Sequence, residues 1–372
     1  MPYSDPPRRP FVRPFSHTLN QLGSHEALRP SQLMDQARAL LEQRAGSSSA
    51  SVSTGSAPIP HPLLTDHVRH ADGLALVLMR SSGVGIAVRP ADTTRVFFDA
   101  SAAYGEDSAF DTLRERIAHV LQAKNITADV ALVHAHVPQT LEYETLGIVA
   151  ALHEALAIPP AQPPSSASGD VQALTLALTV GAARDVVLVD TERREAIVVP
   201  PNAESQAVRW GLVTAPPTRP ASRLTSMDAP RLLKRLQQAT MFARLSTLRA
   251  LEHRDLETAI DEVPRSLQGA LRYWVTEGSR VQKMTVALRK GDWQMVGALM
   301  LMADASRRND ADARDGAATA LIDHLETLAQ PELYGALPTR PGQLLVLGQA
   351  YALPKTLGQL QNDRADVQTV LL

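Results

Sequence analysis

Two histidines with the spacing of metal ligands lie in the first half of this 372-residue sequence. His134 and His136 are two positions apart in the apolar stretch Val130–Val137, which predicts a strand, so both side chains point to one face. A metal ion needs further ligands, and no third His, Asp or Glu has an evident place beside them. A half-buried strand end is the favoured interpretation, and we expect no metal site.

Other reactive groups are few. The chain has no cysteine, which excludes thiolate nucleophiles, zinc–thiolate centres and disulfides and is typical of a reducing cytoplasm. No G-x-G-x-x-G or Walker-type loop is present. Gly46–Ala50 (GSSSA) holds a serine run like that of some phosphate-binding loops, but no glycine-rich turn precedes it and no amphipathic helix follows. We interpret it as a flexible linker.

Charge and hydropathy narrow the class of protein. Lys plus Arg number 37 and Asp plus Glu 39, so the net charge of -2 gives no field that favours nucleic acid or an anionic membrane. No apolar run approaches the ~20 residues that a membrane span needs. Residues 1–30 are rich in Pro and Arg, which predicts a disordered segment and does not fit a secretory signal. We expect a soluble, cytoplasmic protein that binds neither nucleic acid nor a membrane.

The first half of the chain alternates between helices and strands. Helices are predicted at Ser31–Arg44, Ser108–Lys124, Glu142–Leu156 and Val171–Thr179, and strands at Gly73–Arg80, Val84–Arg89, Arg95–Phe98, Val130–Val137, Asp185–Asp190 and Ala196–Val199. A turn at Ser81–Gly83 joins the first two strands in what reads as an antiparallel meander.

The second half is mostly helical. Helices are predicted at Ala229–Leu251, Gln268–Lys290, Trp293–Ala303 and Gly316–Ala329, and strands at Leu344–Leu347 and Val367–Leu372. This order predicts an α+β protein of two lobes, with domains at 31–205 and 206–372.

Three blocks of sequence, in a fixed order, carry the pattern of one family. Pro60–Pro90 aligns without a gap to a signature close to GRVNLIGEHTDYNGG followed by a strand, a turn and a strand ending AVRP. Asp190 follows a strand as in the pattern DCRSL, and Leu271–Asp310 follows a helix pair typically read as VVTEN, then ALRxGD and SLRxD. The residues kept include Leu63, Leu64, His67, Gly73, Gly83, Ala87–Pro90, Val275–Glu277, Arg280, Gly291, Asp292, Ser306, Arg308 and Asp310. In these blocks the chain resembles the galactokinases of the GHMP sugar-kinase family.

This resemblance implies a fold and an activity. The fold is the two-lobed GHMP kinase fold, with an N-terminal α/β lobe built on a mixed sheet and a C-terminal, helix-rich, ferredoxin-like lobe. The activity is ATP-dependent phosphorylation of the C1 hydroxyl of a sugar, with ATP and Mg²⁺ as cofactors.

The phosphate-binding loop departs from the family pattern. The family reads P-x-G-x-G-L-S-S-S-A, where glycines let backbone N–H groups approach the phosphates at a helix N-terminus. The aligned stretch Pro138–Gly147 (PQTLEYETLG) keeps the proline, but both loop glycines and the serine run are replaced. Glu142 and Glu144 fall where the phosphates would approach, and their charges would repel them. We therefore expect no nucleotide binding of the family type and no cofactor.

The sugar-binding positions are altered as well. The family's Glu-His-x-Asp run binds sugar hydroxyls, and here it reads Asp66, His67, Val68, Arg69. Arg69 replaces a hydroxyl acceptor by a cationic donor, which favours an acidic sugar, a sugar phosphate or an internal carboxylate. Asp66 is the nearest internal carboxylate in sequence. The resemblance makes Asp66, His67 and Arg69 the candidate substrate-binding residues.

The catalytic positions are replaced by residues without the required chemistry. The family's signature arginine aligns with Pro60, and its catalytic aspartate aligns near Leu174. Asp170 would take that role only if the helix shifted by one turn. The family's second glycine-rich turn aligns with Thr339–Gln343, which keeps one glycine. We assign no catalytic residue.

Two functional interpretations follow. The favoured one is a galactokinase-like protein without kinase activity that has a binding or regulatory role, with a sugar, an acidic sugar, a sugar phosphate or a protein as its partner. The alternative is an active, ATP-dependent sugar kinase with a divergent site. Its nucleotide-binding residues are not assigned.

Overall fold

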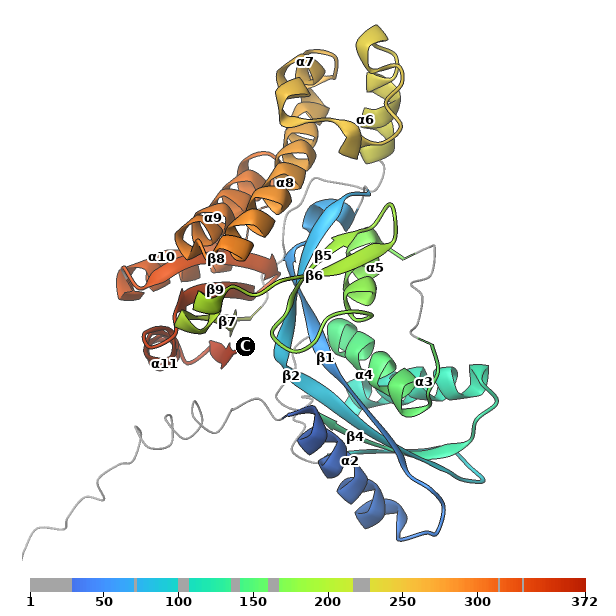
Figure 1. The fold of residues 1–372 in the computed structure, drawn as a ribbon. Coiled ribbons are helices and arrows are strands. Elements are labelled where there is room, and N and C mark those ends of the chain that lie inside the picture. The colour runs from blue at the N-terminus through green and yellow to red at the C-terminus, as the bar shows by residue number, and fades with distance from the viewer. Residues whose placement is uncertain are drawn as a thin grey trace, which may run out of the picture.

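Two β-sheets organise the protein, as a computed structural model shows (Figure 1). The structure describes residues 29–69, 72–99, 107–134, 141–159, 167–216, 228–313, 315–329 and 331–372. The first sheet has the order β3-β4-β2-β5-β6 with β1 paired to β2, and the second has the order β10-β7-β9-β8. Their bounds are β1 Ser53–Leu64, β2 Leu74–Pro90, β3 Arg95–Phe98, β4 Ala128–His134, β5 Val186–Asp190, β6 Glu195–Val199, β7 Val208–Thr214, β8 Leu333–Arg340, β9 Gln343–Gln349 and β10 Gln368–Leu371.

Helices pack on these sheets and define two lobes (Figure 1). The N-terminal lobe contains the first sheet with α2 Pro30–Ala45, α3 Asp107–Ala123, α4 Leu141–Ala155 and α5 Gly169–Ala177. The C-terminal lobe contains the second sheet with α6 Asp228–Leu236, α7 Leu256–Asp261, α8 Arg265–Lys290, α9 Trp293–Asn309, α10 Gly316–Ala329 and α11 Leu353–Asp363. The first sheet is mixed, since β3 runs parallel to β4 and its other pairs are antiparallel. The α+β, two-lobed architecture predicted from the sequence is confirmed.

Strand β2 connects the cores of the two lobes. Its side chains alternate between the faces of the first sheet, so that Val77 and Ile86 join the core under α3, α4 and α5. On the other face, Leu76 and Leu78 pack with Val281 of α8 in a second core that includes residues of the second sheet. The lobes therefore meet through a buried apolar contact.

A short Gly-Asp sequence ends one helix of the C-terminal lobe and begins the next. Gly291 closes α8 in the left-handed conformation at φ 72°, which glycine adopts without steric cost. The side chain of Asp292 then accepts a hydrogen bond from the backbone N–H of Met295 at 3.0 Å, capping α9. These two residues set α8 and α9 side by side over the second sheet.

Several predicted elements are corrected by the structure. Ser81–Gly83 forms no turn, because β2 continues from Leu74 to Pro90. The predicted helix Ala229–Leu251 ends with α6 at Leu236 and continues as 3-10 turns. Strands β1, β7 and β8 and helices α7 and α11 were not predicted. In β1 the reason is its prolines, which lack a backbone donor and are unusual inside a sheet; the pairing of β1 with β2 shifts register between Pro58 and Pro60.

Helix α9 continues to Asn309, beyond its predicted end at Ala303. The remaining predicted elements are confirmed within a few residues, and α10 matches its prediction at both ends. Within the described ranges, no helix is long and apolar enough to cross a membrane.

Candidate functional site

The signature residues form a 3-10 helix, η1 Asp66–Arg69, between β1 and β2. Two neighbouring aromatic residues of α8 hold it from the other lobe. The hydroxyl of Tyr273 donates to Oδ2 of Asp66 at 3.0 Å, and the indole N–H of Trp274 donates to the carbonyl of His67 at 2.8 Å. Burial raises the pKa of Tyr273, so its hydroxyl stays a donor at neutral pH. The segment predicted to bind substrate is thus fixed at the contact between the lobes.

His67 is buried, and one of its ring nitrogens, Nδ1, has no hydrogen-bond partner among the described residues. Its Nε2 lies 2.8 Å from the carbonyl oxygen of Leu74, which only accepts, so Nε2 carries the proton. Burial lowers the pKa of His67 to about 4 and leaves the ring neutral at physiological pH. Its Nδ1 is then a lone-pair acceptor, and among the described residues nothing donates to it. The ring therefore keeps one buried acceptor nitrogen without a donor among the described residues.

A pocket of about 430 Å³ opens beside this ring, at the junction of the lobes; we call it the interlobe pocket. Its lining includes His67 and Leu74 from the N-terminal lobe, Arg249 and Arg254 from 3-10 turns, and Trp274 and Gln282 from α8. Its volume lies within the range of pockets that hold small molecules.

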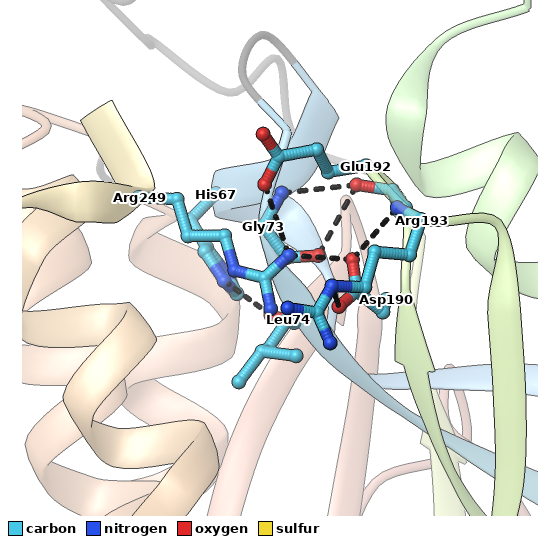
Figure 2. Close-up of polar contacts among 8 residues, drawn as sticks. His67, Gly73, Leu74, Asp190, Glu192, Arg193 and Arg249 are labelled. Carbon is cyan, nitrogen blue, oxygen red and sulfur yellow. Dashed lines mark hydrogen bonds and ion pairs between the residues drawn. The ribbon is translucent and has the colours of Figure 1, made fainter. Parts of the chain in front are cut away.

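Arg249 closes one side of the interlobe pocket (Figure 2). Its guanidinium lies 2.6 Å from Oδ1 of Asp190 and 3.0 Å from Oε2 of Glu192. Burial by itself would raise the pKa of Asp190, but the hydrogen bonds from Arg249 and from the backbone of Arg193 prevail and lower it. The hydroxyl of Thr191 accepts a hydrogen bond from the backbone N–H of Gly73 at 2.9 Å and donates one to the carbonyl oxygen of Gly73 at 3.1 Å. Asp190 is therefore a structural partner of Arg249.

Arg69 is paired with Asp170. Its Nε and NH2 lie 3.0 and 2.9 Å from Oδ2 of Asp170, which is buried in the first turn of α5. Asp66, the nearest carboxylate in sequence, instead accepts from Tyr273, while α5 presents Asp170 to Arg69. The pKa of Asp170 is lowered because hydrogen bonds and the charge of Arg69 prevail over burial.

The positions aligned with catalytic residues have structural surroundings. Leu174 is 0% exposed and belongs to the core under the first sheet. Pro60 pairs with Met79 inside the sheet. Thr339, at the aligned glycine-rich turn, has its hydroxyl 3.1 Å from Nε2 of the buried His61. None of these side chains is placed to take a proton from a substrate hydroxyl.

Some sequence-based predictions lie outside the described residues. These are residues 1–28 of the predicted disordered segment, Pro138 to Thr140 of the aligned phosphate loop, the side chains of Glu142 and Glu144, the side chain of His134, and His136. Helix α4, which follows the loop, is present as predicted. Across the described part of the chain, no group of three metal-ligating side chains gathers.

The sequence reasoning missed a buried charge cluster behind the signature. Glu277 of α8 is 2% exposed and accepts a hydrogen bond from Nε of Arg280 at 2.8 Å. Burial raises the pKa of Glu277 to about 7, although the charge of Arg280 opposes this shift. The family's VTE-x-x-R spacing places both residues on one helix face and was the available signal. This cluster lies next to Asp66 and Arg307 at the contact between the lobes.

Comparison with known proteins supports the resemblance. No protein-family model matches the chain. Human galactokinase is 26% identical over 196 residues, which are 52% of this chain and 48% of the human protein, so the match spans about half of that relative. The structure of Lactococcus lactis galactokinase complexed with galactose has a TM-score of 0.64 and 13% identity, covering 92% of this chain and 97% of that one. L. major mevalonate kinase in complex with R-mevalonate has a TM-score of 0.53 and 14% identity, covering 87% and 96%.

The protein therefore has the two-lobed fold of the GHMP kinases. Within that group, the partial sequence match is to a galactokinase.

Proposed function

We propose that this chain is a galactokinase-like binding or regulatory protein that does not transfer phosphate. The observation that carries the proposal is that Leu174, near which the family's catalytic aspartate aligns, is 0% exposed in an apolar core. A hydroxyl without a base to orient or deprotonate it gains little reactivity. The sequence adds that Glu142 and Glu144 replace the residues that cradle the phosphates. Neither ATP nor Mg²⁺ is a cofactor under this proposal.

The interlobe pocket is the proposed ligand site. His67 supplies a neutral acceptor through its unpartnered Nδ1, while the carboxylate of Asp66 and the guanidinium of Arg69 are already bound to Tyr273 and Asp170. A small molecule with hydroxyl groups fits this arrangement, and a sugar, an acidic sugar or a sugar phosphate is the proposed class. Neutral galactose should bind weakly because, of the three signature residues Asp66, His67 and Arg69, only His67 is among the described residues that line this pocket. A protein partner is the other possible occupant, and we propose a cytoplasmic location.

Thermal unfolding with and without ligand tests the proposal. A ligand at 100 times its dissociation constant adds about 2.7 kcal/mol to the free energy of unfolding. We expect millimolar Mg-ATP to leave the melting temperature unchanged. We expect one of galactose, galacturonate or galactose 1-phosphate to raise it in the wild-type protein and to lose this effect in the variant His67→Phe. A shift with Mg-ATP that a chelator abolishes would contradict the proposal.

One observation favours the alternative of an active kinase. Arg69 and Asp170 place an arginine and an aspartate in contact at the start of α5, one helical turn before Leu174. Such a pair resembles, by residue type, the arginine and aspartate that the family uses on the attacking hydroxyl. The lowered pKa of Asp170 argues against an active kinase, because it makes this carboxylate a weak base. If the protein phosphorylates a sugar, Asp170→Asn should abolish that activity.

A further inference from the structure

A second pocket lies where the first sheet connects to the second. It has a volume of about 310 Å³ and shares no lining residue with the interlobe pocket. We call it the connector pocket. Its lining includes Arg184 before β5, Gln206 in the connection, Arg209 and Trp210 of β7, and Trp293 at the start of α9.

The connector pocket is aromatic. Trp210 and Trp293 are partly buried against the core between the lobes, and they are two of the chain's three tryptophans. The indole N–H of Trp293 is buried, and no described residue accepts a hydrogen bond from it. An indole N–H is only a donor, and a buried donor without an acceptor is unfavourable. A ligand oxygen that reached this nitrogen would supply the missing acceptor.

Two arginines also line the connector pocket. Arg184 and Arg209 both line it, and neither forms an ion pair with a carboxylate in the described part of the chain. Arg209 donates only to the backbone carbonyls of Gln206 and Val208, at 3.4 and 3.1 Å. Among the described lining residues, Asp185 is the one acidic side chain, and its Oδ2 accepts from the backbone N–H of Ala182 at 2.8 Å. Two guanidinium groups therefore remain available to an anion.

We propose that the connector pocket binds a small amphipathic anion, a single flat ring that carries a phosphate or a carboxylate. The ring would pack against the two tryptophans, and the anionic group would take charge-assisted hydrogen bonds from Arg184 and Arg209. An oxygen of the ligand would accept from Trp293. The volume suits one ring with one such group. This site is separate from the proposed function of the interlobe pocket.

Tryptophan fluorescence offers a selective readout. Trp274, the third tryptophan, lines the interlobe pocket, so the variant Trp274→Phe leaves emission from Trp210 and Trp293 alone. Phenyl phosphate, benzoate and neutral benzyl alcohol are titrated into this variant. We expect a saturable change with at least one of the two anions and none with the alcohol at equal concentration. The tighter of the two anions shows whether the pocket prefers a phosphate or a carboxylate.

Charge-removing variants on the same background test the residues. Arg184→Gln and Arg209→Gln should each weaken binding of the anion about tenfold, since each removes one charge-assisted hydrogen bond. Arg231→Gln, at an exposed position on α6 away from the pocket, is the matched control and should change nothing. Equal melting temperatures establish that all three variants fold. The proposal is overturned by no saturable change with either anion, by equal binding of the alcohol, or by unchanged affinity in both arginine variants.

Discussion

At the scale of single residues, burial has opposite effects on two titratable side chains. His67 has its pKa lowered to about 4 and Glu277 has its pKa raised to about 7. Unfolded His67 takes up a proton below its usual pKa of 6.5, so its burial makes stability fall as pH falls from there toward 4. Folded Glu277 keeps its proton up to about 7, so its burial stabilises the protein below pH 4.5 and this stabilisation is lost as pH rises toward 7. Between about pH 4.5 and 6.5, the burial of His67 therefore makes stability rise with pH, whereas the burial of Glu277 makes it fall.

Glu277→Gln should therefore uncover the histidine effect. The amide keeps an acceptor for Arg280 but does not titrate, so the free energy of unfolding should rise with pH more steeply between about 4.5 and 7 than in the wild-type protein. Urea unfolding at a series of pH values measures this slope. Parallel curves for the variant and the wild type would show that Glu277 does not titrate in this range.

The Arg69–Asp170 pair makes a second residue-scale prediction. Arg69→Gln leaves a buried carboxylate with one fewer partner, and should lower the free energy of unfolding by ~1–2 kcal/mol after allowance for the 45% exposure of Arg69. The loss should shrink as pH falls through the pKa of Asp170, which is lowered in the folded protein. Arg114→Gln, in an ion pair 51% and 67% exposed, is the control and should have almost no effect. Equal effects of both variants would contradict this assignment.

At the scale of elements, close backbone contact between α9 and β8 depends on glycine. A Cβ added to Gly335 would lie 2.6 Å from the Cα of Gly297, and one added to Gly297 would meet the carbonyl of Tyr334. Neither atom belongs to a flexible side chain, so the helix or the strand would have to move. These glycines set how closely the helices of the C-terminal lobe approach the second sheet.

Gly297→Ala is accordingly expected to lower the free energy of unfolding by ~1–3 kcal/mol. Gly278, inside α8 with nothing within 4 Å of an added Cβ, is the matched site. Gly278→Ala should stabilise the protein by ~0.5–1 kcal/mol, because alanine favours the helix more than glycine does. Denaturant melts of the two variants compare them directly, and a neutral Gly297→Ala would mean that α9 is free to shift.

How far the elements follow from the sequence depends on which pattern each one carries. Helix α10 was predicted at both ends because its apolar spacing is regular and nothing interrupts it. Strand β1 was not predicted because prolines occupy alternate positions in it, and proline is unusual inside a sheet. Strand β2 was predicted as two strands because Ser81–Gly83 has the composition of a turn. In both cases pairing between the strands overrides local preference.

At the scale of the whole molecule, the order of the lobes was predictable but the contacts between them were not. Tyr273 and Asp66 are 207 positions apart in the chain, and only the packing of α8 against η1 brings them together. The same holds for Asp170, which reaches Arg69 over 101 positions. The division into domains at 31–205 and 206–372 stays a prediction, as do the substrate-binding roles of Asp66, His67 and Arg69. The spacing of the family's motifs thus located the candidate site. The hydrogen-bond and ion-pair partners of its side chains could be identified only from the three-dimensional structure.

Phosphoryl transfer is the activity that the proposed function excludes, and it is measured directly by incubating the protein with galactose and Mg-ATP and following sugar phosphate by ³¹P NMR. Human galactokinase, assayed alongside, confirms that the conditions support the reaction. Because Leu174 is buried where a catalytic aspartate would lie, we predict no sugar phosphate above the protein-free control, for the wild-type protein and for Arg69→Asp. Formation of more than one sugar phosphate per protein molecule, lost in Asp170→Asn, would contradict the proposal and establish an active kinase.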